Sequence, residues 1–390
     1  MSPGFLLLGD AFRFFLLSLH KICPMKNLTR CLFCLTVCAA AMFARAAVVD
    51  ELDFRPLGDM PVLGTLAPDA SVKYTRLPDS LKEKVREDLW NLGQNSAGIS
   101  VRFRTDSHRL AARWHSRLKF NMNHMTATGI RGLDLYVRDG DKWTTLSSAR
   151  PSFNSHNSTS LLVADMEQGV MREYMLYLSL YDGVDSLFIG VDSSAVVLPP
   201  ALNLPKHGKP IVMYGTSILQ GGCASRPGMA HTNILQRELD REVVNLGFSG
   251  NGRLDYEIAR LIADNDVSMV IIDALPNCKA ADLDENLAEF VAIIRRKHPA
   301  IPIVLVESPM FPIHRFDREV HQTLTDKNNH LRAIYQWLVD EGDRNLYLFP
   351  SEKTLGNLVE GTVDNYHYTD YGFQAYADEL LPVIRKLLKD

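Results

Sequence analysis

This chain of 390 residues lacks the patterns that mark metalloenzymes and nucleotide-binding proteins. It has no His-Glu-x-x-His segment and no cluster of cysteine and histidine at the spacing of zinc ligands. The glycine pair Gly221-Gly222 is not followed by Gly-Lys-Ser/Thr, so it does not predict a phosphate-binding loop. We therefore expect a protein that needs no metal and no cofactor.

An excess of positive charge is also missing. The chain has 42 basic and 46 acidic residues, and its formal net charge is −4. Residues 1–46 carry five of the basic residues and one of the acidic ones, so the remainder has a net charge of −8. A mildly acidic protein without a basic stripe is not expected to bind nucleic acid.

Apolar runs long enough to span a bilayer are absent as well. Met25–Arg30 is positively charged, Cys31–Phe43 is apolar but shorter than the roughly 20 residues of a spanning helix, and Ala44-Arg45-Ala46 has the small-x-small pattern of a cleavage site. We expect residues 1–46 to be a signal peptide region, with Met25 as an alternative start. The protein would then be exported, periplasmic or secreted, without stable membrane insertion after cleavage.

Cysteine is scarce outside that region. Four of the six cysteines lie within residues 1–46, which leaves Cys223 and Cys278. Both follow candidate site residues closely, and an exported protein favours disulfides. The two residues are interpreted either as a disulfide pair or as two small buried hydrophobic residues.

Alternation of apolar and polar residues dominates from about residue 47 to 205. Short strands are expected at 99–104, 110–115, 133–138, 174–180 and 187–191, separated by Gly, Asp, Asn and Ser turns. Only the stretch around 80–90 has a helical or irregular pattern. This series of short alternating strands separated by turns predicts an antiparallel β-sandwich.

The pattern changes after Pro199-Pro200, and the second domain is expected at 206–390. Runs that are apolar on both faces predict strands, and these runs alternate with segments of helical period. Such alternation predicts a parallel sheet in a doubly wound α/β domain. The expected strands are 211–214, 243–246, 269–272, 303–306 and 346–349, and the expected helices are 233–241, 254–263, 283–297, 328–339 and 375–388.

Residues suited to hydrolysis stand where these strands end. Gly215-Thr216-Ser217 follows the first strand, Asn245–Gly250 follows the second, and Asp273–Asn277 follows the third. Asp364-Asn365-Tyr366-His367 precedes the last helix. Because active groups collect at the carboxyl ends of parallel strands, these segments can converge on one rim.

Each motif is weak by itself. A serine after a strand often caps the next helix, and Asp-x-x-His is often a solvated turn. Together, a serine, a histidine that can take its proton and an aspartate that can orient that histidine form a nucleophilic triad. His124 is interpreted either as a surface residue or as a group that projects from the sandwich towards the site. Glu307 and Asp273 are expected to have structural roles.

These motifs resemble the SGNH (GDSL-like) hydrolase family over about residues 208–390. The resemblance implies a three-layer, flavodoxin-like α/β/α domain. It identifies Ser217 as the nucleophile, Asp364 and His367 as its partners, and Gly250 and Asn277 as donors to the oxyanion together with the serine N–H. Thr216 stands where many members have aspartate, and Pro276 stands where glycine is common.

The first half resembles the β-rich domain that precedes some exported SGNH hydrolases, through its Gly-x-Asp-Leu-Tyr motif at 132–136. The same layout resembles carbohydrate esterases with a jelly-roll domain. The predicted function is hydrolysis of short acyl esters, most directly acetyl, and the predicted substrate is a small acyl ester or an acylated carbohydrate. The alternatives are a lipase or thioesterase for longer acyl chains and an inert glycan-binding protein. The sequence leaves the oligomeric state open.

Overall fold

The structure is a computed structural model that describes residues 48–68, 70–202, 207–355 and 358–389. The predicted signal peptide region lies outside these residues, as does the predicted domain boundary at 205/206. The chain divides into a unit Met1–Leu52 and a compact unit Asp53–Asp390, and the second unit contains both sheet systems and the catalytic candidates. Among the helices of the described residues, none combines the length and hydropathy required to cross a bilayer.

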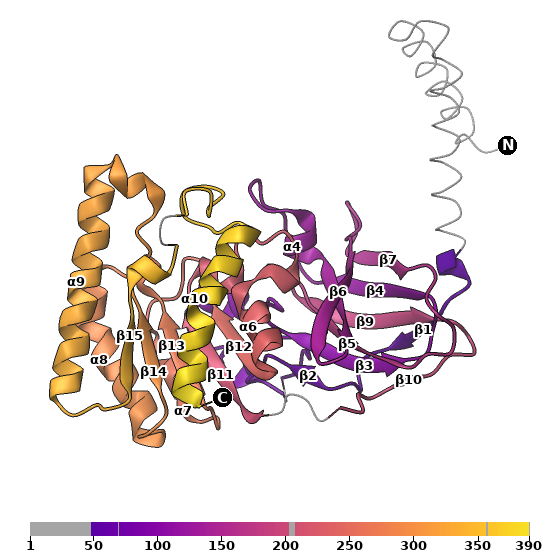
Figure 1. Cartoon of the computed structure of the whole chain (residues 1–390), viewed down its shortest axis with the longest axis horizontal. Coiled ribbons are helices and arrows are strands. Elements are labelled where there is room, and N and C mark those ends of the chain that lie inside the picture. Colours follow the sequence, from indigo (N-terminus) through magenta and orange to yellow (C-terminus); the bar gives the residue numbers. More distant parts are fainter. Residues whose placement is uncertain (1–47, 69, 203–206, 356–357, 390) are drawn as a thin grey trace, which may run out of the picture. The chain divides into compact units, whose positions relative to one another are not determined.

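Two antiparallel sheets form the first half of the compact unit (Figure 1). The first sheet has the order β1 (Asp53–Pro56), β9 (Val184–Val191), β4 (Leu110–Ser116) and β7 (Asn157–Val163). The second has the order β10 (Val197–Leu198), β3 (Ser100–Thr105), β8 (Arg172–Tyr177), β5 (Leu133–Asp139) and β6 (Lys142–Ala149), and β2 (Val62–Leu63) pairs with β3. The short helices of this half are η1 (Asp79–Leu81), α3 (Glu87–Gly93) and α4 (Ala127–Arg131).

Alternating side chains explain why these sheets pack face to face. Val101 and Phe103 of β3 enter the same buried cluster as Trp114 of β4 and Ile189 of β9. Successive residues of a strand point to opposite faces, so an alternating strand buries one face against the partner sheet. The predicted antiparallel β-sandwich is confirmed.

The second half contains a five-stranded parallel sheet. Its order is β12 (Arg241–Gly247), β11 (His207–Gly215), β13 (Met269–Asp273), β14 (Ile303–Val306) and β15 (Leu346–Phe349). The helices along it are α5 (Ser217–Gln220), α6 (His231–Leu239), α7 (Tyr256–Ala263), α8 (Ala280–Lys297), α9 (Arg318–Asp340) and α10 (Asp370–Leu388). The 3₁₀ turns are η2 (Pro227–Met229), η3 (Leu275–Asn277), η4 (Pro312–Arg315) and η5 (Ser351–Lys353).

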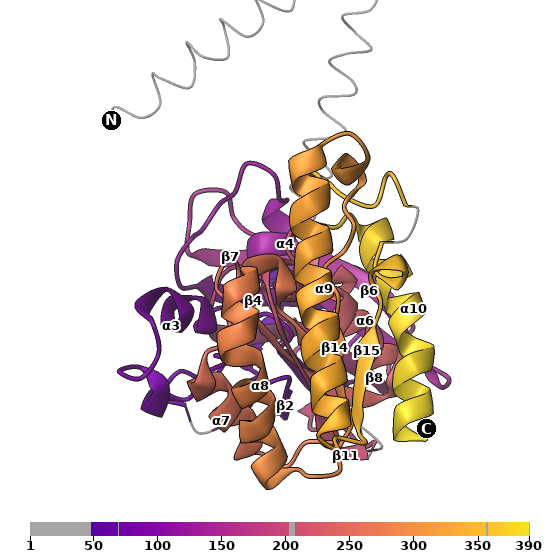
Figure 2. The ribbon, with the colours of Figure 1, turned by 90° about the vertical axis from the view of Figure 1, so that its left-hand side faces the viewer.

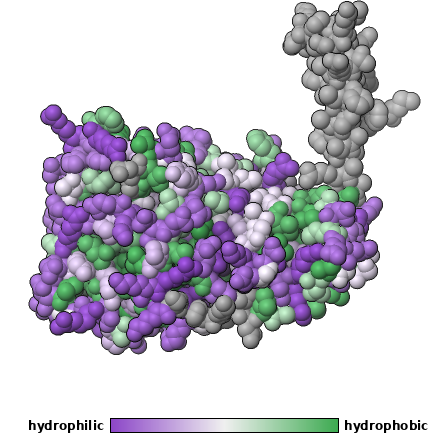
Figure 3. Space-filling model, viewed as in Figure 1, coloured by the Kyte–Doolittle hydropathy of each residue, from purple (hydrophilic) through white to green (hydrophobic). Residues whose placement is uncertain are grey.

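Helices cover both faces of this sheet (Figure 2). Val212 and Tyr214 of β11 pack in one buried cluster with residues of α7 and α8. Ile211 and Met213 of the same strand pack in another cluster with residues of α5, α6 and α10. This alternation produces three layers, and the predicted α/β/α fold is confirmed. Polar side chains cover most of this half on the face seen in Figure 3.

One departure from the expected elements is the length of α9. The helical pattern predicts a start at 328, whereas the helix begins at Arg318. Its first ten residues contain few apolar side chains, so they carry a weak periodic signal. The Asp317 side chain caps this end by accepting hydrogen bonds from the N–H groups of Glu319 and Val320 at 3.0 Å.

Candidate active site

Ser217 is the first residue of α5, directly after the turn that ends β11. The Thr216 side chain caps this helix by accepting the N–H of Ile218 at 3.3 Å. Gly215 is required where the strand ends, because a Cβ there would lie 2.4 Å from the Asp273 carbonyl oxygen of the neighbouring strand. The chain therefore turns sharply and places the serine at the carboxyl end of the sheet.

His367 links Ser217 to Asp364. Its Nε2 lies 2.9 Å from the Ser217 Oγ, and its Nδ1 lies 2.7 Å from an Asp364 carboxylate oxygen. With the Nδ1 proton donated to the carboxylate, Nε2 is free to accept the hydroxyl proton of the serine. The structure thus brings together a serine and a histidine that the sequence places 150 positions apart.

Asp364 is held as a carboxylate. Its other oxygen accepts the backbone N–H of His367 at 2.8 Å and that of Tyr366 at 3.1 Å. Burial acts to raise the pKa of Asp364, but these hydrogen bonds and the His367 ring outweigh it and leave the pKa below its ordinary value. The charged form needed to orient the imidazole is therefore the favoured one.

Gly250 and Asn277 lie in the loops after β12 and β13. Gly250 has a φ of +68°, and open space lies beside it. The Asn277 Oδ1 accepts the N–H of Gly252 at 3.3 Å, which turns the amide so that its Nδ2 hydrogens point elsewhere. Within the described residues, neither the Gly250 N–H nor the Asn277 Nδ2 donates a hydrogen bond to a protein acceptor. Two donors of this kind are suited to an oxyanion.

The sandwich half contacts the serine helix directly. The Tyr181 hydroxyl donates to the Ser217 carbonyl oxygen at 3.3 Å, and the Gln220 side chain donates to the Leu180 carbonyl oxygen at 3.1 Å. The Gln220 Oε1 also accepts the N–H of Ser249 at 3.0 Å, next to Gly250. Residues of both halves therefore fix the backbone around Ser217.

The Gly-x-Asp-Leu-Tyr motif makes a second connection between the halves. Asp134 is fully buried and pairs with Arg226, whose Nη1 also donates to the Tyr136 hydroxyl at 2.8 Å. The same Asp134 oxygen accepts the N–H of Gly228 at 2.9 Å, and the other accepts the Ser148 hydroxyl at 2.8 Å. The sequence shows the motif but not its partner, because Arg226 lies 92 positions away.

Arg226 belongs to the segment 221–228, which follows the serine helix. A Cβ on Gly222 would lie 2.9 Å from the His367 ring, so this segment borders the histidine. The N–H of Ser225 donates to the Asp370 carboxylate at 2.8 Å, at the start of α10. Segment 221–228 is thus tied both to the sandwich and to the helix after His367.

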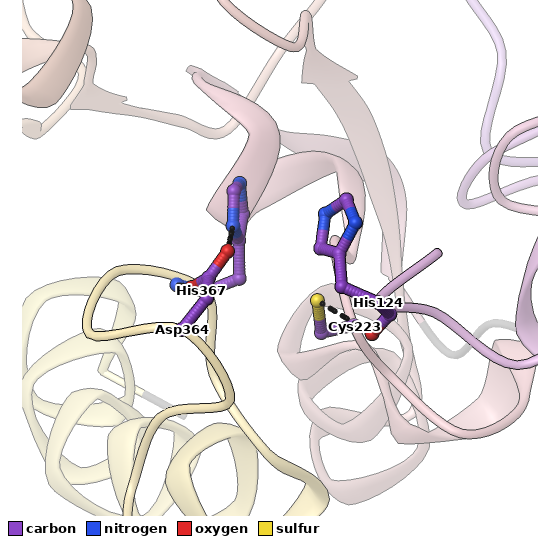
Figure 4. A group of neighbouring side chains, drawn as sticks. All are labelled: His124, Cys223, Asp364 and His367. Carbon is purple, nitrogen blue, oxygen red and sulfur yellow. Dashed lines mark hydrogen bonds and ion pairs between the residues drawn. The ribbon is translucent and has the colours of Figure 1, made fainter. Parts of the chain in front are cut away.

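Four potential metal ligands lie close together around His367 (Figure 4). Ligand atoms of His124, Cys223, Asp364 and His367 all lie within 4.8 Å of one another. They include zinc-ligand types. Asp364 is hydrogen-bonded to His367, and His367 to Ser217, so these two residues already have partners within the protein.

His124 comes from the loop between β4 and α4, and its ring centroid lies 5.5 Å from that of His367. The interpretation as a group that projects towards the site agrees with this position. The Glu307 carboxylate, in contrast, is fully buried and pairs with Arg332. Asp273 accepts the Tyr376 hydroxyl at 3.0 Å.

The disulfide interpretation of Cys223 and Cys278 is wrong in this structure, since both thiols are free and buried. The Cys223 Sγ lies 3.4 Å from the His124 carbonyl oxygen, whereas the Cys278 Sγ lies 3.7 Å from that of Gly252. The two side chains face different loops. Burial raises the pKa of each thiol to about 12, which favours the neutral form.

Comparison with known proteins agrees with this architecture. Residues 208–385 match the GDSL-like lipase/acylhydrolase family, and residues 53–197 match the GxDLY domain found at the N-terminus of SGNH-type esterases. A putative GDSL-like lipase from Bacteroides ovatus is 30% identical, with a TM-score of 0.82 over 87% of this chain and 98% of its own. The chain therefore belongs to the GDSL-like (SGNH) hydrolase family, and it is an esterase.

More distant structures share the fold. The salicylyl acyltransferase SsfX3 of a tetracycline biosynthetic pathway is 18% identical, with a TM-score of 0.68 over 87% of this chain and 97% of its own. An acetyl xylan esterase from Butyrivibrio proteoclasticus is 10% identical, with a TM-score of 0.54 over 87% of this chain and 99% of its own. A search among curated proteins returned no significant match.

Proposed function

We propose that this esterase hydrolyses short acyl esters, in particular acetyl esters of carbohydrates, through an acyl-serine intermediate. The observation that carries the proposal is the hydrogen-bonded chain from Asp364 through His367 to the Ser217 hydroxyl. This is the arrangement in which a serine becomes nucleophilic at neutral pH.

The first half of the reaction forms the acyl-enzyme. The Ser217 Oγ attacks the ester carbonyl carbon while its proton passes to the His367 Nε2. Negative charge develops on the carbonyl oxygen, where the N–H groups of Ser217 and Gly250 and the amide of Asn277 are available as donors. Each donor of this kind lowers the barrier by about 3–4 kcal/mol. Collapse of the intermediate breaks the bond to the alcohol, which takes the proton from His367.

The second half releases the acid. A water molecule gives a proton to the His367 Nε2 as its oxygen attacks the acyl carbon. The carbon–Oγ bond then breaks, and the serine oxygen recovers its proton from the same nitrogen. Asp364 keeps the imidazole in one orientation and stabilises its charged form in both halves.

The carbohydrate part of the proposal has separate support. Carbohydrate esterases, including the acetyl xylan esterase from Butyrivibrio proteoclasticus, match the fold of this chain over 75–87% of its length. These likenesses concern the fold, so the sugar and the acyl chain length are parts of the proposal that substrate assays must test.

Substitution of the nucleophile tests the mechanism. Ser217→Ala is expected to abolish hydrolysis of a chromogenic acetyl ester while circular dichroism and the unfolding transition remain those of the wild type. A fluorophosphonate probe should label the wild type and not the variant. A variant that keeps its turnover would contradict the proposal. A graded series of acyl esters separates an acetylesterase from a lipase or thioesterase, since only the latter prefers long chains.

We also propose that the protein is exported after removal of residues 1–46. The charged, apolar and small-x-small segments of this region support the proposal. Expression of the full chain, fractionation of the cells and N-terminal sequencing of the exported protein should find a first residue at or near Ala47. A protein that stays inside the cell with its N-terminus intact would contradict the proposal.

A further inference from the structure

A pocket of about 330 Å³ is lined by residues of the sandwich half and of the loop that follows β12. Leu92 of α3, Phe120 and Met122 of the loop after β4, and Tyr181 contribute its apolar wall. Ser249 lines it from the second half of the chain. Its volume falls in the range of about 300–1,000 Å³ that small-molecule sites occupy. An acetyl group alone would leave most of this space empty.

Three features join the pocket to the catalytic centre. Ser249 directly precedes Gly250, and the hydroxyl of Tyr181 donates to the Ser217 carbonyl oxygen at 3.3 Å. Met122 lies two residues before His124, whose ring is 5.5 Å from that of His367. The pocket wall therefore continues, within one or two residues, into the loops that carry Gly250 and His124.

The side chain of Asn95 contributes an amide group to this pocket. Asn95 is only 3% exposed, and among the described residues its amide Oδ1 and Nδ2 have no hydrogen-bond partner. The Oδ1 is closed to solvent, so the Nδ2 is the end of the amide that a ligand can reach. Its backbone is held in place, because its N–H donates to the Leu92 carbonyl oxygen and its own carbonyl accepts from the buried Arg76. The Nδ2 is therefore a free donor, and a hydroxyl oxygen of a ligand in the pocket can accept its hydrogen bond.

The other polar groups of the pocket favour a neutral ligand. Asn91, Asn251 and Asp88 also line it, and none of the described lining residues is cationic, so an anionic ligand is disfavoured. Asn251 is fixed, because its Oδ1 accepts from Arg86 and its Nδ2 donates to the Ser249 carbonyl oxygen at 3.1 Å. Amide groups in fixed positions suit hydrogen bonds to hydroxyl groups.

The apolar side chains of the pocket offer a contact surface for the ring of such a ligand. Phe120 is 42% exposed and Leu118 is 54% exposed, so apolar surface is open to a ligand at the pocket. A sugar ring has one apolar face of C–H groups and a rim of hydroxyls, and it can therefore contact both kinds of surface. A hydrocarbon acyl chain would leave the Asn95 amide without a partner.

We propose that this pocket is the subsite for the sugar ring that carries the scissile ester. It would bind a neutral sugar, with the ring against Phe120 and a hydroxyl group on Asn95. This proposal rests on the proposed function, because it assigns the alcohol part of the same substrate. It also gives the sandwich half a part in substrate recognition.

Two substrates with the same acyl group test the proposal. Acetylated methyl hexoside fills the pocket, whereas methyl acetate has an alcohol that is too small to reach it, and a pH-stat measures acid release from both. Asn95→Leu removes the amide and keeps a similar volume. We expect kcat/KM for the hexoside ester to fall by about tenfold, the equivalent of one lost hydrogen bond, and kcat/KM for methyl acetate to stay within about twofold.

Phe120→Ala is the second variant, and its exposed position makes it safe for folding. It should show the same selective loss, while Asn329→Leu on the exposed side of α9 is a matched control that should change neither substrate. Equal losses on both substrates, or no loss on either, would overturn the sugar subsite. So would a loss that appears only with methyl hexanoate, since this result would assign the pocket to the acyl chain. Failure of the proposed function is separate, because it would show as turnover by Ser217→Ala.

Discussion

The pair Asp134–Arg226 allows a quantitative test of how the two halves depend on each other. Asp134 is fully buried, and the side chain of Arg226 is 24% exposed. Burial raises the pKa of Asp134, and the Arg226 guanidinium opposes that rise. Removal of one member of a buried ion pair typically destabilises a protein by about 3–5 kcal/mol, because the other charge is left without its partner.

The two single substitutions should differ in size. Asp134→Leu leaves a guanidinium that water can partly reach, so we expect a loss of about 3 kcal/mol. Arg226→Met leaves a carboxylate in a fully buried position, so we expect a loss of about 4–5 kcal/mol at roughly pH 8. The loss should be smaller at about pH 5, because a buried carboxyl with a raised pKa takes up a proton and no longer needs the cation.

Urea unfolding of the wild type, both single variants and the double variant Asp134→Leu/Arg226→Met measures these free energies. Replacement of both members by apolar side chains should cost much less than the sum of the single losses. The same variants should lower kcat, because Arg226 anchors the segment whose Gly222 borders His367. Single losses below about 1 kcal/mol that add up in the double variant would refute the reasoning.

Three further predictions concern single residues. Asn277→Ala should lower kcat by about 10²–10³-fold with little change in KM, as measured on an acetyl ester, because one oxyanion donor is lost. Burial raises the pKa of Asp273 to about 7. The folded protein therefore binds this proton more tightly than the unfolded chain, and stability falls as the pH rises from about 4 to about 7. Asp273→Asn should therefore be more stable than the wild type at about pH 8 and lose that advantage at about pH 4, in urea unfolding at both pH values. Burial lowers the pKa of His231 from 6.5 to about 3. Here the unfolded chain binds the proton more tightly, so stability falls as the pH drops below about 6.5, by up to about 1.4 kcal/mol per pH unit. His231→Phe should flatten this part of the stability–pH curve, and an unchanged slope would contradict the assignment.

Much of the fold follows from local sequence patterns. The apolar runs 303–306 and 346–349 predict strands with the bounds that the structure has. Each run is short and lies between helical segments, so the ends of the strand are well defined in the sequence. The sequence does not predict β6 and β7 as strands, since Thr and Ser fill many of their positions and their apolar alternation is weak. Prediction succeeds where local periodicity is strong and fails where it is weak.

The sequence by itself also determined which residue types stand at the strand ends, because a strand, a turn and a helix are local patterns. The candidate residues Ser217, Gly250 and Asn277 follow three strands of one parallel sheet, and their catalytic roles stay predictions that await the substitutions proposed for them. Asp364 lies within three residues of His367, so a short turn is enough to bring their side chains together.

Only the tertiary structure decided which distant residues meet. The contact between Ser217 and His367, the ion pair between Asp134 and Arg226, and the separate directions of the two cysteines all depend on how the layers pack. Such contacts join residues that are far apart in the chain, and no local pattern records the side chain on the other side of an interface. The pocket around Asn95 exists for the same reason, since its walls come from both halves of the molecule.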